Sequence, residues 1–197
     1  MISLLSHPVF YLLFQAIIGA KRARKESVKL YAPPKSGQRV LDIGCGTGYV
    51  IEYFPNTEYI GFDTDRAYIN YAKNRYGKIG TFYCQEFDDT AADRHGNFNL
   101  VIMNGLLHHL DDNSVKLLLE RVKKVLKPDA YVVTLDGCYI DGQSSIAKIL
   151  LDGDRGKFVR DKDKYESLAS DVFNSVTSHI HNDWLFIPYT MIAMKMH

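Results

Sequence analysis

The segment VLDIGCGTG at residues 40–48 constrains the fold of this chain more than any other. Residues 39–43 predict a short buried strand, because apolar side chains surround a single acid. A backbone without Cβ atoms lets a ligand lie directly against it. Glycines, which have no Cβ atom, follow the strand at every second position, at Gly44, Gly46 and Gly48. We expect a helix over residues 47–54, with its unpaired N–H groups directed toward that ligand.

The spacing of these glycines separates the turn from two other nucleotide-binding patterns. A dinucleotide fingerprint G-x-G-x-x-G would need its third glycine where Tyr49 stands, and a P-loop would need Gly-Lys-Ser/Thr. The pattern D-x-G-x-G-x-G is complete here and resembles the first motif of class I S-adenosylmethionine (SAM) methyltransferases. The resemblance implies SAM as cofactor and S-adenosylhomocysteine as product. It also assigns cofactor binding to Asp42, Gly44, Cys45, Gly46 and Gly48.

An acid at the end of the next predicted strand, residues 59–63, completes this pattern. Asp63 follows Asp42 by about twenty residues, the spacing at which a βαβ unit places a carboxylate on a ribose. A carboxylate can accept hydrogen bonds from both ribose hydroxyls. We therefore expect Asp63 and the adjacent Thr64 to bind the cofactor. The alternative is that Asp63 only caps the helix that starts near Asp65.

Further cofactor contacts are expected after the third and fourth predicted strands. The resemblance places Glu86 at the adenine amino group and Phe87 as an apolar wall beside it. A solvated acidic loop is the alternative, because Asp88 and Asp89 crowd the same segment. Asn104 follows the fourth strand and joins the same site, because parallel strands end at one edge of the sheet.

The overall pattern alternates apolar runs with helical periodicity, which predicts an α/β fold. The parallel strands are predicted at residues 39–43, 59–63, 81–84, 98–103 and 131–136. An antiparallel pair, 173–181 and 184–196, joined by Asn182 and Asp183, closes the chain. The resemblance implies a Rossmann-like, doubly wound sheet of seven mostly parallel strands, with an antiparallel last strand and helices on both faces.

The length of 197 residues predicts a single domain, and the apolar fraction of 46% is that of a globular protein. Its expected parts are an N-terminal helical cover (1–34), a cofactor-binding core (38–136), an acceptor-side helical insertion (137–172) and a closing strand pair (173–197). A net charge of +1 gives no field for nucleic acid or an anionic membrane. The three cysteines are far apart, which favours a reducing, cytoplasmic location.

The apolar stretch at residues 9–18 is too short to span a bilayer, so no integral membrane segment is expected. We expect it to form an amphipathic helix packed on the domain. A helix lying on a membrane surface is the alternative.

The segment NGLLHHL at residues 104–110 is the candidate catalytic segment. It resembles the segment of many small-molecule methyltransferases in which an aliphatic pair precedes His-His or Glu-His. That resemblance favours His108 as the pocket-facing base for a hydroxyl acceptor, while His109 packs or bonds to backbone. Neighbouring side chains on a helical turn diverge by about 100°, so one of the two is expected in the pocket. The alternative is that neither acts, since a neutral amine or a carboxylate needs no strong base.

Acceptor binding is expected in the segment that follows the fifth strand. The candidate residues are Asp136, Tyr139, Arg155 and Arg160. The two arginines could hold a carboxylate or phosphate through paired hydrogen bonds, whereas a solvated charged surface is the alternative. His179, His181 and Asp183 alternate on one late strand and are expected at the surface, so no metal is predicted.

These observations predict a SAM-dependent methyltransferase with a small-molecule acceptor, most simply an O-methyltransferase. The build resembles small bacterial methyltransferases of surface-polysaccharide and secondary-metabolite pathways, which implies a sugar or a related polar acceptor. N-methylation of a small amine or a protein side chain is one alternative. A catalytically inactive, SAM-binding scaffold subunit is another, and both a monomer and a homodimer remain open.

Overall fold

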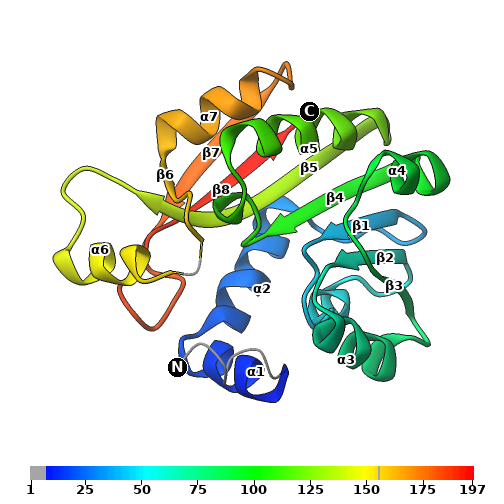
Figure 1. The fold of residues 1–197 in the computed structure, drawn as a ribbon, viewed down its shortest axis with the longest axis horizontal. Helices are drawn as coiled ribbons and strands as arrows, with labels where there is room; N and C mark the ends of the chain where they lie inside the picture. The colour runs from blue at the N-terminus through cyan, green and yellow to red at the C-terminus, as the bar shows by residue number, and fades with distance from the viewer. Residues whose placement is uncertain (1–7, 155) are drawn as a thin grey trace.

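The predicted alternation of strands and helices is present in the computed structural model, which describes residues 8–154 and 156–197 (Figure 1). The strands are β1 (Arg39–Ile43), β2 (Glu58–Asp63), β3 (Gly80–Cys84), β4 (Phe98–Asn104), β5 (Leu126–Tyr139), β6 (Arg160–Asp161), β7 (Val176–His181) and β8 (Met191–Met196). The helices are α1 (Pro8–Ile17), α2 (Ala20–Tyr31), α3 (Arg66–Tyr76), α4 (Asp89–His95), α5 (Asp112–Lys124), α6 (Ser145–Asp152) and α7 (Lys162–Ser170). Two short 3₁₀ helices are η1 (Tyr49–Tyr53) and η2 (Leu107–His109).

Seven strands form one sheet in the order β3-β2-β1-β4-β5-β8-β7, and the two-residue strand β6 pairs with β5 beside it. Strands β1 to β5 pair in parallel, whereas β8 runs antiparallel to both β5 and β7. This arrangement confirms the predicted doubly wound α/β fold. The strand order reverses direction between β1 and β4, and sheets of this type bind ligands outside the carboxyl ends of the strands at that position.

The central strands are apolar on both sides because they separate two cores. Leu41 and Val101 pack with residues of α4, α5 and α7, whereas their chain neighbours Val40 and Leu100 pack with residues of α2, η1 and α3. Figure 1 shows α5 and α7 on one side of the sheet and α2 and α3 on the other. Burial of both faces explains why the parallel strands read as nearly continuous apolar runs instead of alternating ones.

The N-terminal helices pack against the domain. The hydroxyl of Tyr31 on α2 lies 2.8 Å from Nε2 of His181 on β7, and Ala23 joins a small core with Trp184. Ile18 accepts a hydrogen bond from the backbone N–H of Phe186 at 2.9 Å. Each helix in the described part of the chain is too short or too polar to cross a lipid bilayer.

Two predicted elements differ in the structure. The segment expected as a helix at residues 47–54 is the shorter 3₁₀ helix η1, which begins after Gly48, whose φ is +73°. The second closing strand was predicted to begin at Trp184 but begins at Met191, so the β7–β8 connection spans residues 182–190. Pro188 lacks the N–H that a strand in the sheet must donate, which explains the late start of β8.

Candidate active site

A cavity of about 970 Å³ opens at the carboxyl edge of the sheet. Its walls come from the carboxyl ends of β1 to β4 with the turns that follow them, and from the carboxyl half of β5. The region of α1 and α2, the helices α5 and α6 with the loop after α6, and the β7–β8 connection complete them. Pockets for cofactors and small molecules have volumes of roughly 300–1,000 Å³. The size and position of this cavity therefore suit a cofactor together with a small second ligand.

The glycine turn and Asp63 form one hydrogen-bonded unit at the cavity wall. The backbone N–H of Gly46 donates to Oδ2 of Asp63 at 2.8 Å, and the N–H of Asp65 donates to Oδ1 at 2.8 Å. Burial raises the pKa of Asp63, although these N–H groups act in the opposite direction. The helix cap is Asp65, whose side chain accepts from the N–H groups of Ala67 and Tyr68. Asp63 therefore remains at the cavity wall, with its oxygens able to accept further bonds.

The turn itself leaves room for a ligand. Gly44 and Gly46 have φ values of +74° and +54°, which favour glycine, and a Cβ atom at Gly46 would meet no atom within 4 Å. Across the cavity, Oδ1 of Asn104 is buried and has no hydrogen-bond partner among the described residues. A backbone cradle and an unpaired buried acceptor fit the nucleoside and amino-acid parts of SAM.

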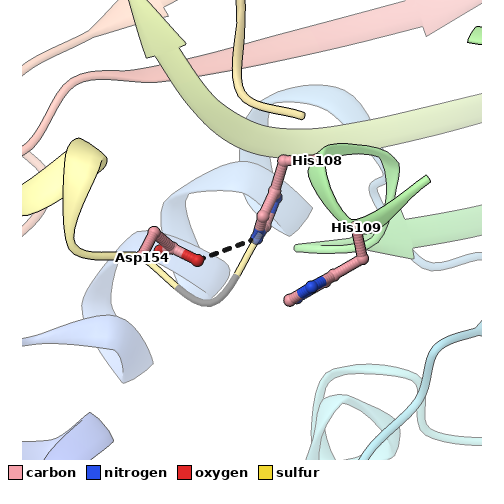
Figure 2. Close-up of side chains that lie close together, drawn as sticks. All are labelled: His108, His109 and Asp154. Atoms are coloured by element: carbon pink, nitrogen blue, oxygen red, sulfur yellow. Dashed lines mark ion pairs between the residues drawn. The ribbon is translucent and has the colours of Figure 1, made fainter. Parts of the chain in front are cut away.

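The second half of the site is a chain of three side chains centred on His108. Nδ1 of His108 lies 2.8 Å from Oδ1 of Asp136 on β5. On the other side of the ring, Nε2 lies 3.3 Å from Oδ1 of Asp154 (Figure 2). Asp154 follows α6 and also accepts hydrogen bonds from the N–H of Gly156 and the hydroxyl of Tyr189, each at 2.9 Å. The imidazole is thus held between two carboxylates.

These contacts shift the pKa values of both His108 and Asp154. Burial disfavours the charged imidazole, but the hydrogen bonds and charges of Asp136 and Asp154 outweigh it and raise the pKa of His108 to about 9. Burial acts to raise the pKa of Asp154, whereas His108 and the Gly156 N–H hold it well below its usual range. Both aspartates therefore stabilise the protonated form of the His108 imidazole.

Comparison with known proteins identifies the domain. The sequence of residues 17–160 matches the family described as "Methyltransferase domain". The chain belongs to this family of SAM-dependent methyltransferases. A SAM-dependent methyltransferase from Archaeoglobus fulgidus shares the fold with a TM-score of 0.73 at 17% identity, over 95% of this chain and 99% of that one.

Two curated relatives of this methyltransferase domain act on oxygen by name. Ubiquinone biosynthesis O-methyltransferase of Chelativorans sp. (strain BNC1) is 28% identical over 153 residues, which are 71% of this chain and 60% of the relative. Malonyl-[acyl-carrier protein] O-methyltransferase of Bacillus cytotoxicus is 32% identical over 85 residues, which are 41% of this chain and 29% of the relative. The chain thus spans less than two thirds of the length of both relatives.

Most of the cofactor residues predicted from the sequence line the cavity of the methyltransferase domain. They are Gly44, Gly46, Asp63, Thr64, Glu86, Phe87 and Asn104. Three others lie behind the turn. Asp42 is buried and accepts a hydrogen bond from the Tyr59 hydroxyl, Cys45 packs beside Gly61, and Gly48 packs against Phe82 and Ala72.

Of the predicted acceptor residues that the structure describes, one lines the cavity and two do not. Asp136 lines the cavity, but Tyr139 bonds to Asp152 and is absent from the cavity wall. Arg160 is buried, and its guanidinium donates to the carbonyl oxygens of Leu107, Phe158 and Leu110 and to the carboxylate of Asp112. Arg160 thus supports the turn that carries His108 instead of facing the cavity. Arg155 lies outside the described residues.

The cavity residues Asp154 and Tyr189, which contact each other beside His108, were not predicted from the sequence. Asp154 lies in a charged loop from which the sequence predicts only Arg155 as a binding residue, and Tyr189 lies in the segment predicted as the second closing strand. The Gly153 and Pro188 beside them mark loops, and loops at the carboxyl edge of a parallel sheet commonly carry the functional side chains.

Proposed function

We propose that this protein transfers the methyl group of SAM to an oxygen atom of a small-molecule acceptor. One observation carries the proposal: a single cavity joins the Gly44–Gly46 turn and Asp63 on one side to His108, Asp136 and Asp154 on the other. SAM supplies a methyl group already activated on a sulfonium. The protein then has to hold two ligands in line, and a cavity that both ligands share allows this.

The residues of the first half bind and orient the cofactor. Asp63 accepts hydrogen bonds from the ribose hydroxyls, and Glu86 accepts one from the adenine amino group. Phe87 packs on the base, since it is an apolar part of the same wall. The side chain of Asn104 has a buried oxygen without a partner in the described structure, and it accepts a hydrogen bond from the amino-acid part of SAM.

The second half favours an acceptor with an apolar body and few polar groups. The wall beside Asp154 and Tyr189 is built largely from apolar side chains, which are Leu106, Ile149, Leu150, Leu185, Ile187 and Met191. A sugar would leave most of its hydroxyls without partners there, at a free-energy cost for each. An aromatic or aliphatic hydroxy compound fits this lining better than the polar acceptor expected from the sequence.

The names of the two curated relatives support oxygen as the methylated atom. N-methylation of an amine is the second candidate, and one observation favours it. Asp136 and Asp154 place two carboxylates beside the acceptor space, and these would attract a cationic amine. Such an amine must lose its proton before it can attack the methyl group, so this candidate also requires a group that removes a proton.

An acceptor screen tests the proposal. The full chain is incubated with SAM and four classes of acceptor, namely phenols, hydroxy acids, sugars and amines, and S-adenosylhomocysteine and the methylated product are measured by mass spectrometry. We expect turnover with apolar hydroxy compounds, and much slower turnover by an Asp63→Ala variant at low SAM concentration. SAM binding without turnover in any class would contradict the proposed activity and favour the inactive scaffold. Turnover of amines alone would favour N-methylation.

A further inference from the structure

Three metal-ligand side chains converge on one point of the acceptor half. His108 and His109 stand next to each other on η2, and Asp154 reaches them from the loop after α6 (Figure 2). Each offers one ligand atom, and the three atoms lie within 4.8 Å of one another. Within residues 8–154 and 156–197, no other group of at least three histidine, cysteine or acidic side chains meets this condition.

The contacts around this cluster hold two of its members in ligand geometry. Asp136 binds Nδ1 of His108 at 2.8 Å, and this leaves Nε2 directed at Asp154. A carboxylate on the far nitrogen is the usual support of a metal-binding histidine, because it fixes the ring and makes the other nitrogen a better ligand. Asp154 is fixed in turn by the Gly156 N–H and the Tyr189 hydroxyl.

We propose that His108, His109 and Asp154 bind a divalent transition-metal cation, of the Mn²⁺, Co²⁺ or Zn²⁺ type, at the acceptor side of the cavity. Two imidazoles and one carboxylate are a donor set that such cations prefer, and three protein ligands leave positions open for another molecule. All three residues line the cavity, so the open positions face the space that the acceptor occupies. This last step rests on the proposed function, whereas the metal site itself does not.

The distances suit a cation after a small movement. Ligand atoms about 2.0–2.2 Å from an ion stand roughly 3–3.5 Å from each other. The Nε2–Oδ1 separation of 3.3 Å between His108 and Asp154 already meets this value. The ligand atom of His109 lies within 4.8 Å of the other two, so this exposed side chain would have to move closer for one cation to bind all three.

The local charge also favours a cation. Asp136 and Asp154 put two carboxylates on one imidazole, and Oδ2 of Asp136 is buried with no hydrogen-bond partner among the described residues. The pattern His179, His181 and Asp183, by contrast, forms no such group. The His181 ring stacks on Trp184 with centroids 3.5 Å apart, and its Nε2 contacts the Tyr31 hydroxyl.

A bound cation would also act on an acceptor hydroxyl that occupies one of its open positions. The hydroxyl would lose its proton to solvent more easily there, because the cation would stabilise the resulting anion. The oxygen–methyl bond then forms as the sulfur–methyl bond breaks, and the electron pair of the broken bond stays on sulfur. S-adenosylhomocysteine leaves as a neutral thioether.

Direct metal binding tests the proposal without any need for turnover. The full chain, free of histidine tags and treated with chelator, is titrated with Co²⁺ while visible absorption and heat are recorded. We expect one equivalent to bind, and we expect His109→Ala and Asp154→Asn each to weaken binding by more than about 100-fold. His179→Ala is the matched control, since it removes an exposed histidine outside the cluster and should bind as the wild type does.

Circular dichroism of each variant establishes that it is folded, and the exposed His109 gives a variant that should fold if Asp154→Asn does not. Failure of the wild type to bind Co²⁺, Mn²⁺ or Zn²⁺ would overturn the metal site, as would equal binding by His109→Ala. A SAM titration of the same samples separates the two proposals. SAM binding without metal binding overturns only the metal site, and metal binding without SAM binding overturns only the proposed function.

Discussion

Gly156 packs directly on His108, and a Cβ atom at position 156 would stand 1.9 Å from Cδ2 of the imidazole. The next contact, 2.7 Å to the backbone oxygen of His108, could not be relieved by a side-chain rotation. The neighbouring Phe158 donates its N–H to that same oxygen at 3.0 Å. The loop after α6 therefore approaches η2 closely only because residue 156 has no side chain.

The Gly156→Ala substitution should separate the loop from His108. We expect a loss of about 1–3 kcal/mol in unfolding free energy from overpacking, together with a large loss of turnover at unchanged SAM affinity. Gly153→Ala in the same loop is the control, because its Cβ would stand 3.3 Å from the backbone oxygen of Ile149 and would need only a small adjustment. Equal turnover of the two variants would show that the loop contact does not matter for the site.

Asp63 and Asp65 offer a matched pair of carboxylates for testing the cofactor half. Asp63→Ala should weaken SAM binding about 10- to 150-fold, because hydrogen bonds to a charged group contribute about 1.5–3 kcal/mol. Asp65→Ala removes the cap of α3 and should cost about 1 kcal/mol of stability at unchanged SAM affinity. Calorimetric titration of both variants with SAM measures these effects. Unchanged affinity in Asp63→Ala would contradict the proposal that Asp63 binds the ribose hydroxyls.

The buried carboxyl group of Asp42 should make the stability of the protein depend on pH. Burial raises its pKa to about 7, although the Tyr59 hydroxyl acts to lower it. The folded state therefore holds a proton that the unfolded chain releases near pH 4. Stability should fall as pH rises from about 4 to 7, by on the order of 4 kcal/mol.

The Asp42→Asn variant cannot ionise and should lack this dependence. Its thermal midpoint relative to that of the wild type should therefore rise steadily between pH 4 and pH 7.5. Scanning calorimetry across that range measures the difference. A difference that stays constant with pH would mean that Asp42 ionises in the folded protein as readily as in the unfolded chain.

A substitution of Arg160 tests whether this residue supports the structure, as its contacts indicate, or binds the acceptor, as the sequence predicts. Lysine cannot reproduce the branched set of bonds to three carbonyl oxygens and Asp112, so Arg160→Lys should cost about 2–3 kcal/mol in urea denaturation. Arg121→Lys, at a more exposed pair with Asp89, should cost less than about 1 kcal/mol. Unchanged stability of Arg160→Lys with a raised KM for the acceptor would restore the binding role.

The fold and the cofactor half of the site could be predicted from the sequence because their signals are local. The apolar runs specify parallel strands, and the Gly44–Gly48 turn and Asp63 each follow a strand directly. Parallel strands then bring these groups to one edge without any further information. His108 could be predicted to lie at the same edge, because it comes shortly after β4.

The acceptor half could not be predicted in the same way because its contacts cross long stretches of chain. Asp154 reaches His108 through a loop whose path depends on Gly156, and Tyr189 holds Asp154 from the β7–β8 connection. Arg160 carries a charge and is nevertheless buried, because its guanidinium donates to Asp112 and to the carbonyl oxygens of Leu107, Leu110 and the nearby Phe158. The spacing of residues in the sequence does not predict contacts between loops that lie far apart in the chain.

The central claim is that the cavity binds SAM, and calorimetric titration of the unmodified protein with SAM and S-adenosylhomocysteine tests it most directly. We predict one site with micromolar affinity for both ligands, which corresponds to about −8 kcal/mol. The cavity around Asp63 and the glycine turn would then be a working cofactor site. Absence of binding for both ligands at millimolar concentration would contradict the account.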